Sequence, residues 1–139
     1  MMLDMSTSPE EVASTTREVF ARHPDVRTAF LFGSVARRTA RSDSDVDIAV
    51  TGARVDLAGL ASELSLVVGC EVDLVSLDSD PPIALLRELI RDGICLHESE
   101  RGAATAVRTR ALWAIETDGP IIDALAKRYV DRLAARAHS

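Results

Sequence analysis

Short apolar runs alternate with helical patterns along most of this chain, and that alternation restricts it to a few architectures. The apolar runs are each short enough to be a strand and cover about residues 26–32, 46–50, 70–76 and 94–97. The helical patterns lie before, between and after them, at about residues 9–22, 35–39, 57–68, 82–92, 100–117 and 120–137. This order predicts one α/β domain with a C-terminal helical extension.

Composition narrows the class of protein. The 139 residues carry a net charge of −6, which argues against a protein held to nucleic acid by overall charge, and we expect no direct nucleic-acid partner. No apolar stretch is long enough to span a membrane, and the N-terminus has no visible signal peptide. Cys70 and Cys95 lack motif spacing, which favours reduced, buried thiols and a cytoplasmic location.

Several residues predict where helices begin and end. Ser8, Pro9 and Glu11 form a capping-box start for the first helix. Gly69 is placed to end the helix over residues 57–68. Near the C-terminus, Gly119 and Pro120 predict a break between two helices.

Two polar motifs flank the loop between the first two expected strands. Gly33 and Ser34 follow an apolar run, where backbone N–H groups can receive an anion such as a phosphate, although such a pair is more often an ordinary turn. Asp45 and Asp47 alternate with apolar residues, so both carboxylates point to one face of a strand, about 6.6 Å apart. Two such acids suit Mg²⁺, while a solvated acidic face is the alternative interpretation.

A third acid strengthens the metal hypothesis. Asp73 has apolar neighbours on the next expected strand. If the two strands are adjacent, its carboxylate can reach the same ions as Asp45 and Asp47. Three converging carboxylates suit a two-metal displacement at a phosphoryl centre.

Together these motifs resemble the signature of the polymerase-β-like nucleotidyltransferase superfamily. The stretch from Leu31 to Val50 is similar to the minimal nucleotidyltransferases, or MNT proteins, and the resemblance continues through residues 69–75 and 82–96. It implies an α/β (α+β) fold, with a small mixed sheet flanked by helices. One departure is Arg38, where the family usually has Gly, and we expect it to affect the loop over the triphosphate.

The resemblance also implies an activity, a Mg²⁺-dependent nucleotidyltransferase with ATP as substrate. The catalytic and metal-binding residues, around two Mg²⁺ ions, would be Asp45, Asp47 and Asp73. The nucleotide-binding residues would be Gly33, Ser34, Arg37 and Ser44, with a surface role as the equal alternative for Arg37.

The acceptor is expected to belong to a partner macromolecule. Antibiotic-modifying relatives place a sugar acceptor against a sizeable second domain, but only about 40 residues follow His97. MNT proteins of this kind resemble antitoxins that transfer AMP to a tyrosine of a cognate HEPN ribonuclease toxin, and we expect a hetero-oligomer with such a toxin. A non-catalytic antitoxin that acts by binding and a small-molecule nucleotidyltransferase are the alternatives.

The predicted domain organisation is a nucleotidyltransferase core at residues 1–98, with C-terminal helices at residues 99–139 as part of the same domain. The last helix carries an apolar stripe that includes Ile121, Leu125, Tyr129 and Leu133. We expect most of this stripe to pack on the domain, with a partner contact near its end.

Overall fold

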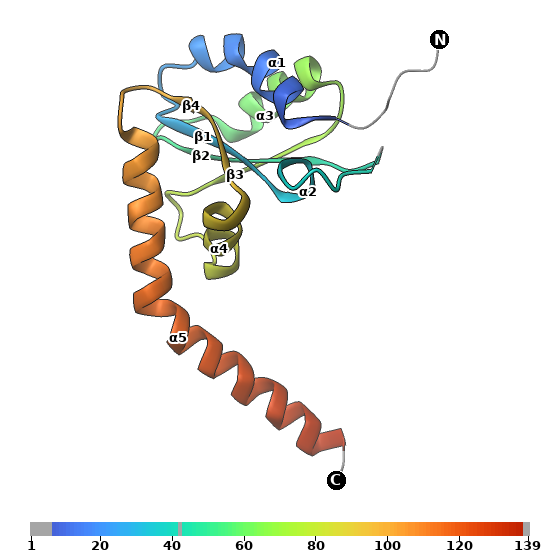
Figure 1. The fold of residues 1–139 in the computed structure, drawn as a ribbon, viewed down its shortest axis with the longest axis vertical. Helices are drawn as coiled ribbons and strands as arrows, with labels where there is room; N and C mark the ends of the chain where they lie inside the picture. The colour runs from blue at the N-terminus through green and yellow to red at the C-terminus, as the bar shows by residue number, and fades with distance from the viewer. Residues whose placement is uncertain (1–6, 42, 138–139) are drawn as a thin grey trace.

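The computed structural model describes residues 7–41 and 43–137 as a mixed α/β fold with a long C-terminal helix (Figure 1). The strands are β1 (Thr28–Phe32), β2 (Val46–Thr51), β3 (Val72–Ser76) and β4 (Ile94–Glu98). The helices are α1 (Pro9–Ala21), α2 (Gly33–Ala36), α3 (Leu57–Val68), α4 (Ile83–Asp92) and α5 (Ala103–Ala137). The α/β class predicted from the alternation is confirmed.

The four strands form one mixed sheet in the order β3-β2-β1-β4. Strand β1 pairs antiparallel with both β2 and β4, whereas β2 and β3 run parallel. Parallel neighbours need a crossover connection, and α3 provides it between β2 and β3. The sheet therefore brings together residues from an early hairpin and from a segment that follows α3.

Helices cover both faces of the sheet and create two cores. Helices α1 and α3 lie on one face, where the largest core includes Val12, Leu31, Ile48 and Leu64. On the other face, α4 and the first half of α5 pack over Phe30 of β1. Because side chains alternate along a strand, odd and even positions of β2 serve opposite faces. The apolar positions of β2 at 46, 48 and 50 belong to the α1/α3 core, so its alternate residues face α4.

The predicted helix signals act as expected at two sites. The Ser8 hydroxyl accepts a hydrogen bond from the Glu11 backbone N–H at 3.1 Å, which caps α1. At the end of α3, Gly69 adopts a left-handed φ of 85° and its N–H donates to the Ser65 carbonyl. Cys70 and Cys95 are free, but they are only half-buried, because each lies at the border of a core rather than inside it.

The C-terminal helix corrects two expectations. Residues 103–137 form one helix, so the predicted break at Gly119 and Pro120 is wrong. Pro120 lacks the N–H for one helical hydrogen bond and crowds the preceding turn, and Figure 1 shows α5 changing direction about midway along its length. The helix bends instead of ending, and its second half leads away from the sheet.

The expected packing of the last apolar stripe on the domain is also wrong. All residues from 120 to 137 are exposed, whereas the buried residues of α5 are Ala103, Ala104, Val107, Ala111 and Gly119. The bend at Pro120 is the physical reason, because it directs the stripe past the edge of the sheet. Within the described residues, no helix is both long and apolar enough to cross a membrane.

Candidate active site

Asp47 is the centre of the candidate site. It is the second residue of β2, and its neighbours Val46 and Ile48 are buried in the α1/α3 core. The alternation of the strand therefore turns Asp47 to the opposite face, toward α4. Its side chain is half-buried, between solvent and the packed sheet.

The sheet brings Asp73 beside Asp47, as the sequence predicts for adjacent strands. The parallel register of β2 and β3 pairs Asp47 with Asp73 directly. Asp45 precedes the first residue of β2, and Asp45 and Asp73 are both exposed. The three acids thus lie at the beginning of β2 and β3, with one carboxylate partly withdrawn from water and two open to it.

Gly33 lies against the Asp47 carboxylate. The antiparallel pairing of β1 and β2 sets Phe32 opposite Asp47, so the turn after β1 meets this acid. A Cβ atom on Gly33 would lie 2.2 Å from Asp47 Oδ2, and Gly33 has a φ of 77°. A glycine is required here for two reasons, the close approach and the left-handed backbone.

The surroundings of Asp47 oppose its ionisation. Burial raises the pKa of Asp47, and the negative charges of Asp73, Asp45 and Glu88 raise it further. Arg37 acts in the opposite direction and lowers it. The fold therefore holds several negative charges close together at this point, with too little positive charge to balance them.

Two acids of α4 also belong to the neighbourhood, and sequence reasoning missed both. Arg37 Nη1 lies 3.3 Å from Glu88 Oε1 and 3.8 Å from Asp92 Oδ2. Glu88 and Asp92 are four residues apart, so they share one face of the helix, and that spacing was a visible signal. The Arg37 guanidinium, expected to bind nucleotide, is here paired with α4.

The remaining predicted nucleotide-binding residues shape the loop between β1 and β2. The Ser34 carbonyl accepts a hydrogen bond from the Thr39 N–H at 2.9 Å. The Ser44 hydroxyl accepts one from the Arg41 N–H at 2.8 Å, which makes Ser44 part of a tight turn. The Ser44 hydroxyl is therefore already hydrogen-bonded within its own loop, and Ser34 lies beside Gly33 at the start of α2.

Arg38 adopts a backbone conformation that favours glycine. Its φ is 62°, in the left-handed region, which explains why a Gly suits this position in the MNT pattern. The Arg38 side chain pairs with Glu10 in the first turn of α1. This ion pair raises the pKa of Arg38 and lowers that of Glu10. Arg38 therefore ties the loop to α1.

The acids of the site fit a divalent cation in their chemistry. Carboxylate oxygens are the ligands that Mg²⁺ prefers, and a cation would relieve the repulsion that raises the Asp47 pKa. Within residues 7–41 and 43–137, no group of three or more His, Cys, Asp and Glu side chains is arranged to hold a metal ion by itself. Of the three acids, Asp45 and Asp47 are the residues that would hold such an ion.

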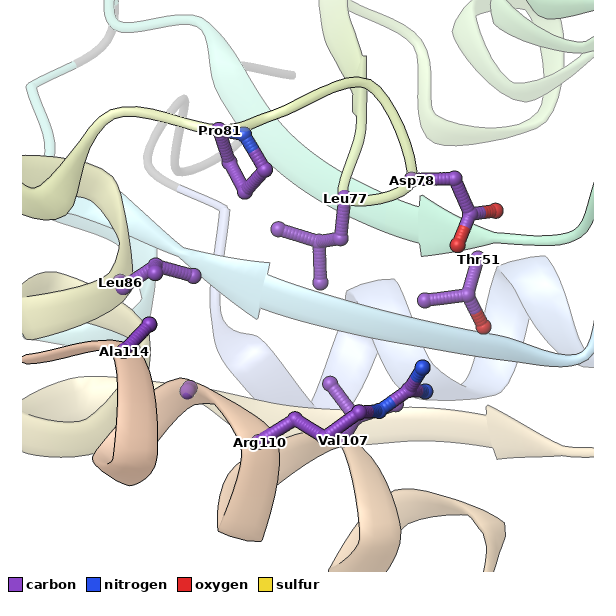
Figure 2. A pocket seen from close by; sticks show the side chains of 9 residues that line it. Thr51, Leu77, Asp78, Pro81, Leu86, Val107, Arg110 and Ala114 are labelled. Atoms are coloured by element: carbon purple, nitrogen blue, oxygen red, sulfur yellow. The ribbon is translucent and has the colours of Figure 1, made fainter. Parts of the chain in front are cut away.

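A separate cavity lies at the opposite end of the sheet from these acids. Figure 2 shows this cavity of about 170 Å³, where Arg110 and Val107 of α5 face Leu77 and Asp78, which follow β3. Thr51, the last residue of β2, lines it, whereas Asp47 lies at the beginning of that strand. The walls are mostly apolar, and none of the predicted site residues contributes to it.

The sequence also matches a known protein family. Residues 14–102 match the family described as polymerase beta, nucleotidyltransferase. The chain belongs to this nucleotidyltransferase family. The match spans most of the chain and includes β1, the Gly33 turn, the acids of β2 and β3, and all of α4. The expected superfamily and the expectation of a nucleotidyltransferase enzyme are confirmed.

Several solved structures share the fold of this chain. One is a chain of a toxin–antitoxin crystal structure with AMP-PNP, with a TM-score of 0.61 and 23% identity over 89% of this chain and 99% of that chain. Another belongs to the toxin–antitoxin MntA-HepT, with a TM-score of 0.60 and 21% identity over 84% and 98%.

A third belongs to the tri-AMPylated Shewanella oneidensis HEPN toxin in complex with MNT antitoxin, with a TM-score of 0.56 and 21% identity over 82% and 98%. At these identities, the three likenesses show a shared fold. A search of curated proteins found no match.

Proposed function

We propose that this chain is an antitoxin that transfers AMP from ATP to a tyrosine of a cognate HEPN ribonuclease toxin, in the presence of Mg²⁺. The observation that carries the proposal is the pairing of Asp47 with Asp73 beside the Gly33 turn. Charged side chains brought together on a sheet face are unfavourable for stability alone, which favours a role in catalysis.

The Gly33 turn and the three acids have separable roles in this reaction. The triphosphate would lie on the turn, because Gly33 leaves room for a close approach and Ser34 offers its hydroxyl and N–H. Asp45 and Asp47 would hold Mg²⁺, with Asp73 sharing a second ion. When bound, Mg²⁺ supplies positive charge to the phosphates and to the acceptor oxygen.

The transfer itself makes and breaks one bond at the α-phosphorus. The tyrosine oxygen forms the new bond to this phosphorus, and the bond to the pyrophosphate oxygen breaks. Asp73, which is exposed and next to Asp47, would accept the tyrosine proton. Pyrophosphate leaves with the bonding electron pair.

The acceptor is inferred from the fold neighbours. One neighbour is a complex with AMP-PNP, and another contains a HEPN toxin described as tri-AMPylated. The alignments cover 99% and 98% of these two neighbouring chains, so nearly all of each neighbour has a counterpart in this chain.

Asp73→Asn tests the enzymatic role. The change keeps the shape of the side chain, removes its charge and should slow the transfer by a factor of about 10² or more. Intact-mass measurement of the co-expressed toxin should lose the step of about 329 Da per transferred AMP. Asp25→Asn is the matched control, because Asp25 is an exposed acid whose backbone lies against Gly52, at the opposite end of β2 from Asp47.

The same variant separates catalysis from inhibition by binding. If Asp73→Asn neutralises the toxin as well as the unmodified chain does, the non-catalytic alternative is correct.

The double variant Asp45→Ala/Asp47→Ala should abolish Mg²⁺-dependent ATP binding in calorimetry. Equal ATP affinity with and without Mg²⁺ in the unmodified chain would refute the metal assignment.

A further inference from the structure

The second half of α5, residues 120–137, forms an arm with an exposed apolar stripe. Its large apolar side chains include Ile121, Leu125 and Tyr129, which are 61%, 55% and 60% exposed. Ile122, Val130 and Leu133 are exposed as well. An apolar surface of this size on one element is typical of a binding surface.

The stripe continues the face with which α5 packs on the domain. In the first half of α5, the buried residues Ala104, Val107 and Ala111 follow one another at steps of three and four residues. The same steps lead along the helix to Ile122, Leu125, Tyr129 and Leu133. One helical face is therefore covered by the sheet and α4 at one end and left open at the other.

The arm is held in position at its base. Arg87 of α4 donates two hydrogen bonds to the Asp123 carboxylate, at 3.1 and 2.9 Å. The Arg87 guanidinium passes over Gly119, where a Cβ atom would lie 2.9 Å from Nη2. The exposure of the stripe therefore belongs to a fixed arm rather than to an unanchored helix end.

A groove joins the body to the base of the arm. It has a volume of about 380 Å³, and its lining includes Ile83 and Leu86 of α4 and Ile121 and Ile122 of the arm. In the view of Figure 1 the arm passes below α4 toward the side on which α2 lies. A molecule seated on the stripe would therefore also contact α4, the helix whose Glu88 and Asp92 border the candidate site.

The charge of the arm differs from that of the rest of the chain. Residues 120–137 contain four basic and two acidic residues, a net charge of +2, so the rest of the chain carries −6 − 2 = −8. Arg128, Arg132 and Arg136 succeed one another every four residues and run beside the stripe. An occupant of the stripe must therefore meet apolar side chains and a row of arginines together.

We infer that the arm docks a partner protein whose surface presents an apolar strip bordered by carboxylates, and that this partner is the protein acceptor of the transfer. The second clause rests on the proposed function, and the first does not. A second copy of this chain fits less well, because paired arms would bring their arginine rows together. Nucleic acid fits less well, because the stripe is mainly aliphatic and offers a single aromatic ring for base stacking.

Site-specific photo-crosslinking in the source cells tests the inference. A photoreactive phenylalanine analogue replaces Leu125 or Tyr129 in the full chain, both exposed positions where the fold does not depend on the side chain. Lys127 is the matched control position, since it lies on the opposite side of the helix from these two residues. The expected result is a covalent adduct to a different protein from positions 125 and 129 and none from 127.

Two further readouts decide what the adduct means. The crosslinked peptide should combine apolar and acidic residues, and Arg128→Glu/Arg132→Glu should lower the adduct yield at least about tenfold. An adduct to a second copy, an adduct to RNA, equal yields from position 127, or no adduct would each overturn the inference. If the docked protein forms the adduct but never carries AMP, docking stands and the proposed function fails.

Discussion

The candidate site and the arm are both unfavourable surfaces, but for opposite reasons. At the site, the sheet gathers negative charges around a half-buried Asp47. On the arm, the helix leaves large apolar side chains in water. In both regions a bound partner removes the unfavourable term. Positive charge reduces the repulsion between the carboxylates of the site, and an apolar surface shields the stripe of the arm from water.

The two regions also differ in what fixes them. Strand register holds Asp47 and Asp73 side by side, and antiparallel pairing holds Gly33 against Asp47. The arm depends on its own helical hydrogen bonds and on the Arg87–Asp123 contact at its base. Substitutions near the site should therefore lower the stability of the fold, whereas substitutions on the arm should leave the fold intact.

The largest expected effect contrasts the two halves of α5. Val107→Asp places a charge in the core beside Phe30 and should lower the free energy of unfolding by about 3 kcal/mol or more. Leu125→Asp makes the same kind of change on the open stripe and should alter it by less than about 0.5 kcal/mol. Urea unfolding measures both. Similar losses would mean that the arm packs on the body.

A second pair of variants measures the close approach at the site. Gly33→Ala combines a left-handed φ with a Cβ atom 2.2 Å from Asp47 Oδ2, and should destabilise by about 2 kcal/mol. Gly69→Ala has a similar φ but no atom within 4 Å, so it should lose only about 1 kcal/mol. Equal losses in thermal unfolding would show that Asp47 moves away from Gly33 freely.

The loop beside the site offers a smaller effect at Arg38. Its φ of 62° makes Gly the less strained choice, so Arg38→Gly should be more stable than Arg38→Ala by about 1 kcal/mol. Both variants lose the contact with Glu10, and the comparison therefore isolates the backbone. An Ala variant as stable as the Gly variant in urea unfolding would exclude strain at this residue.

The smallest effect concerns the charge of Asp47 itself. Because the folded pKa of Asp47 is raised above the usual value of 3.8, its ionised form opposes folding. The loss of stability begins as the pH rises through 3.8 and is complete above the folded pKa. Asp47→Asn should therefore raise stability slightly at pH 7, by less than about 1 kcal/mol, with no gain below pH 3.8. Thermal unfolding at both pH values measures this. A gain that persists at low pH would contradict an electrostatic cause.

The site could be predicted from sequence where local pattern determines geometry. The alternation around Asp45 and Asp47 predicted strand β2 and the face to which Asp47 points, and the apolar neighbours of Asp73 predicted strand β3. Gly33 was predicted as a turn residue, but its contact with Asp47 depends on the β1–β2 register, which no local pattern contains. The pairing of Arg37 with Glu88 joins residues 51 positions apart and was missed for the same reason.

The end of the chain was harder to predict, because sequence does not show what covers an apolar stripe. Gly119 and Pro120 are strong helix-ending residues, yet the helix continues with a bend, since a single missing hydrogen bond can be tolerated. The stripe beyond Pro120 has the spacing of a packed face, and its exposure follows from the direction of the bend. Both the continuation of α5 through Pro120 and the exposure of the stripe depend on the tertiary structure, which the local sequence does not contain.

The sheet order has a consequence for how Asp73 is interpreted. Strand β3 is an edge strand, and its open backbone groups offer a template for pairing with another chain. A charged side chain on such an edge, here Asp73 near the start of β3, discourages the intermolecular β-pairing that leads to aggregation. The charge of Asp73 therefore also helps to keep the protein soluble. A variant that removes this charge should be tested for self-association before its loss of activity is attributed to a catalytic role of Asp73.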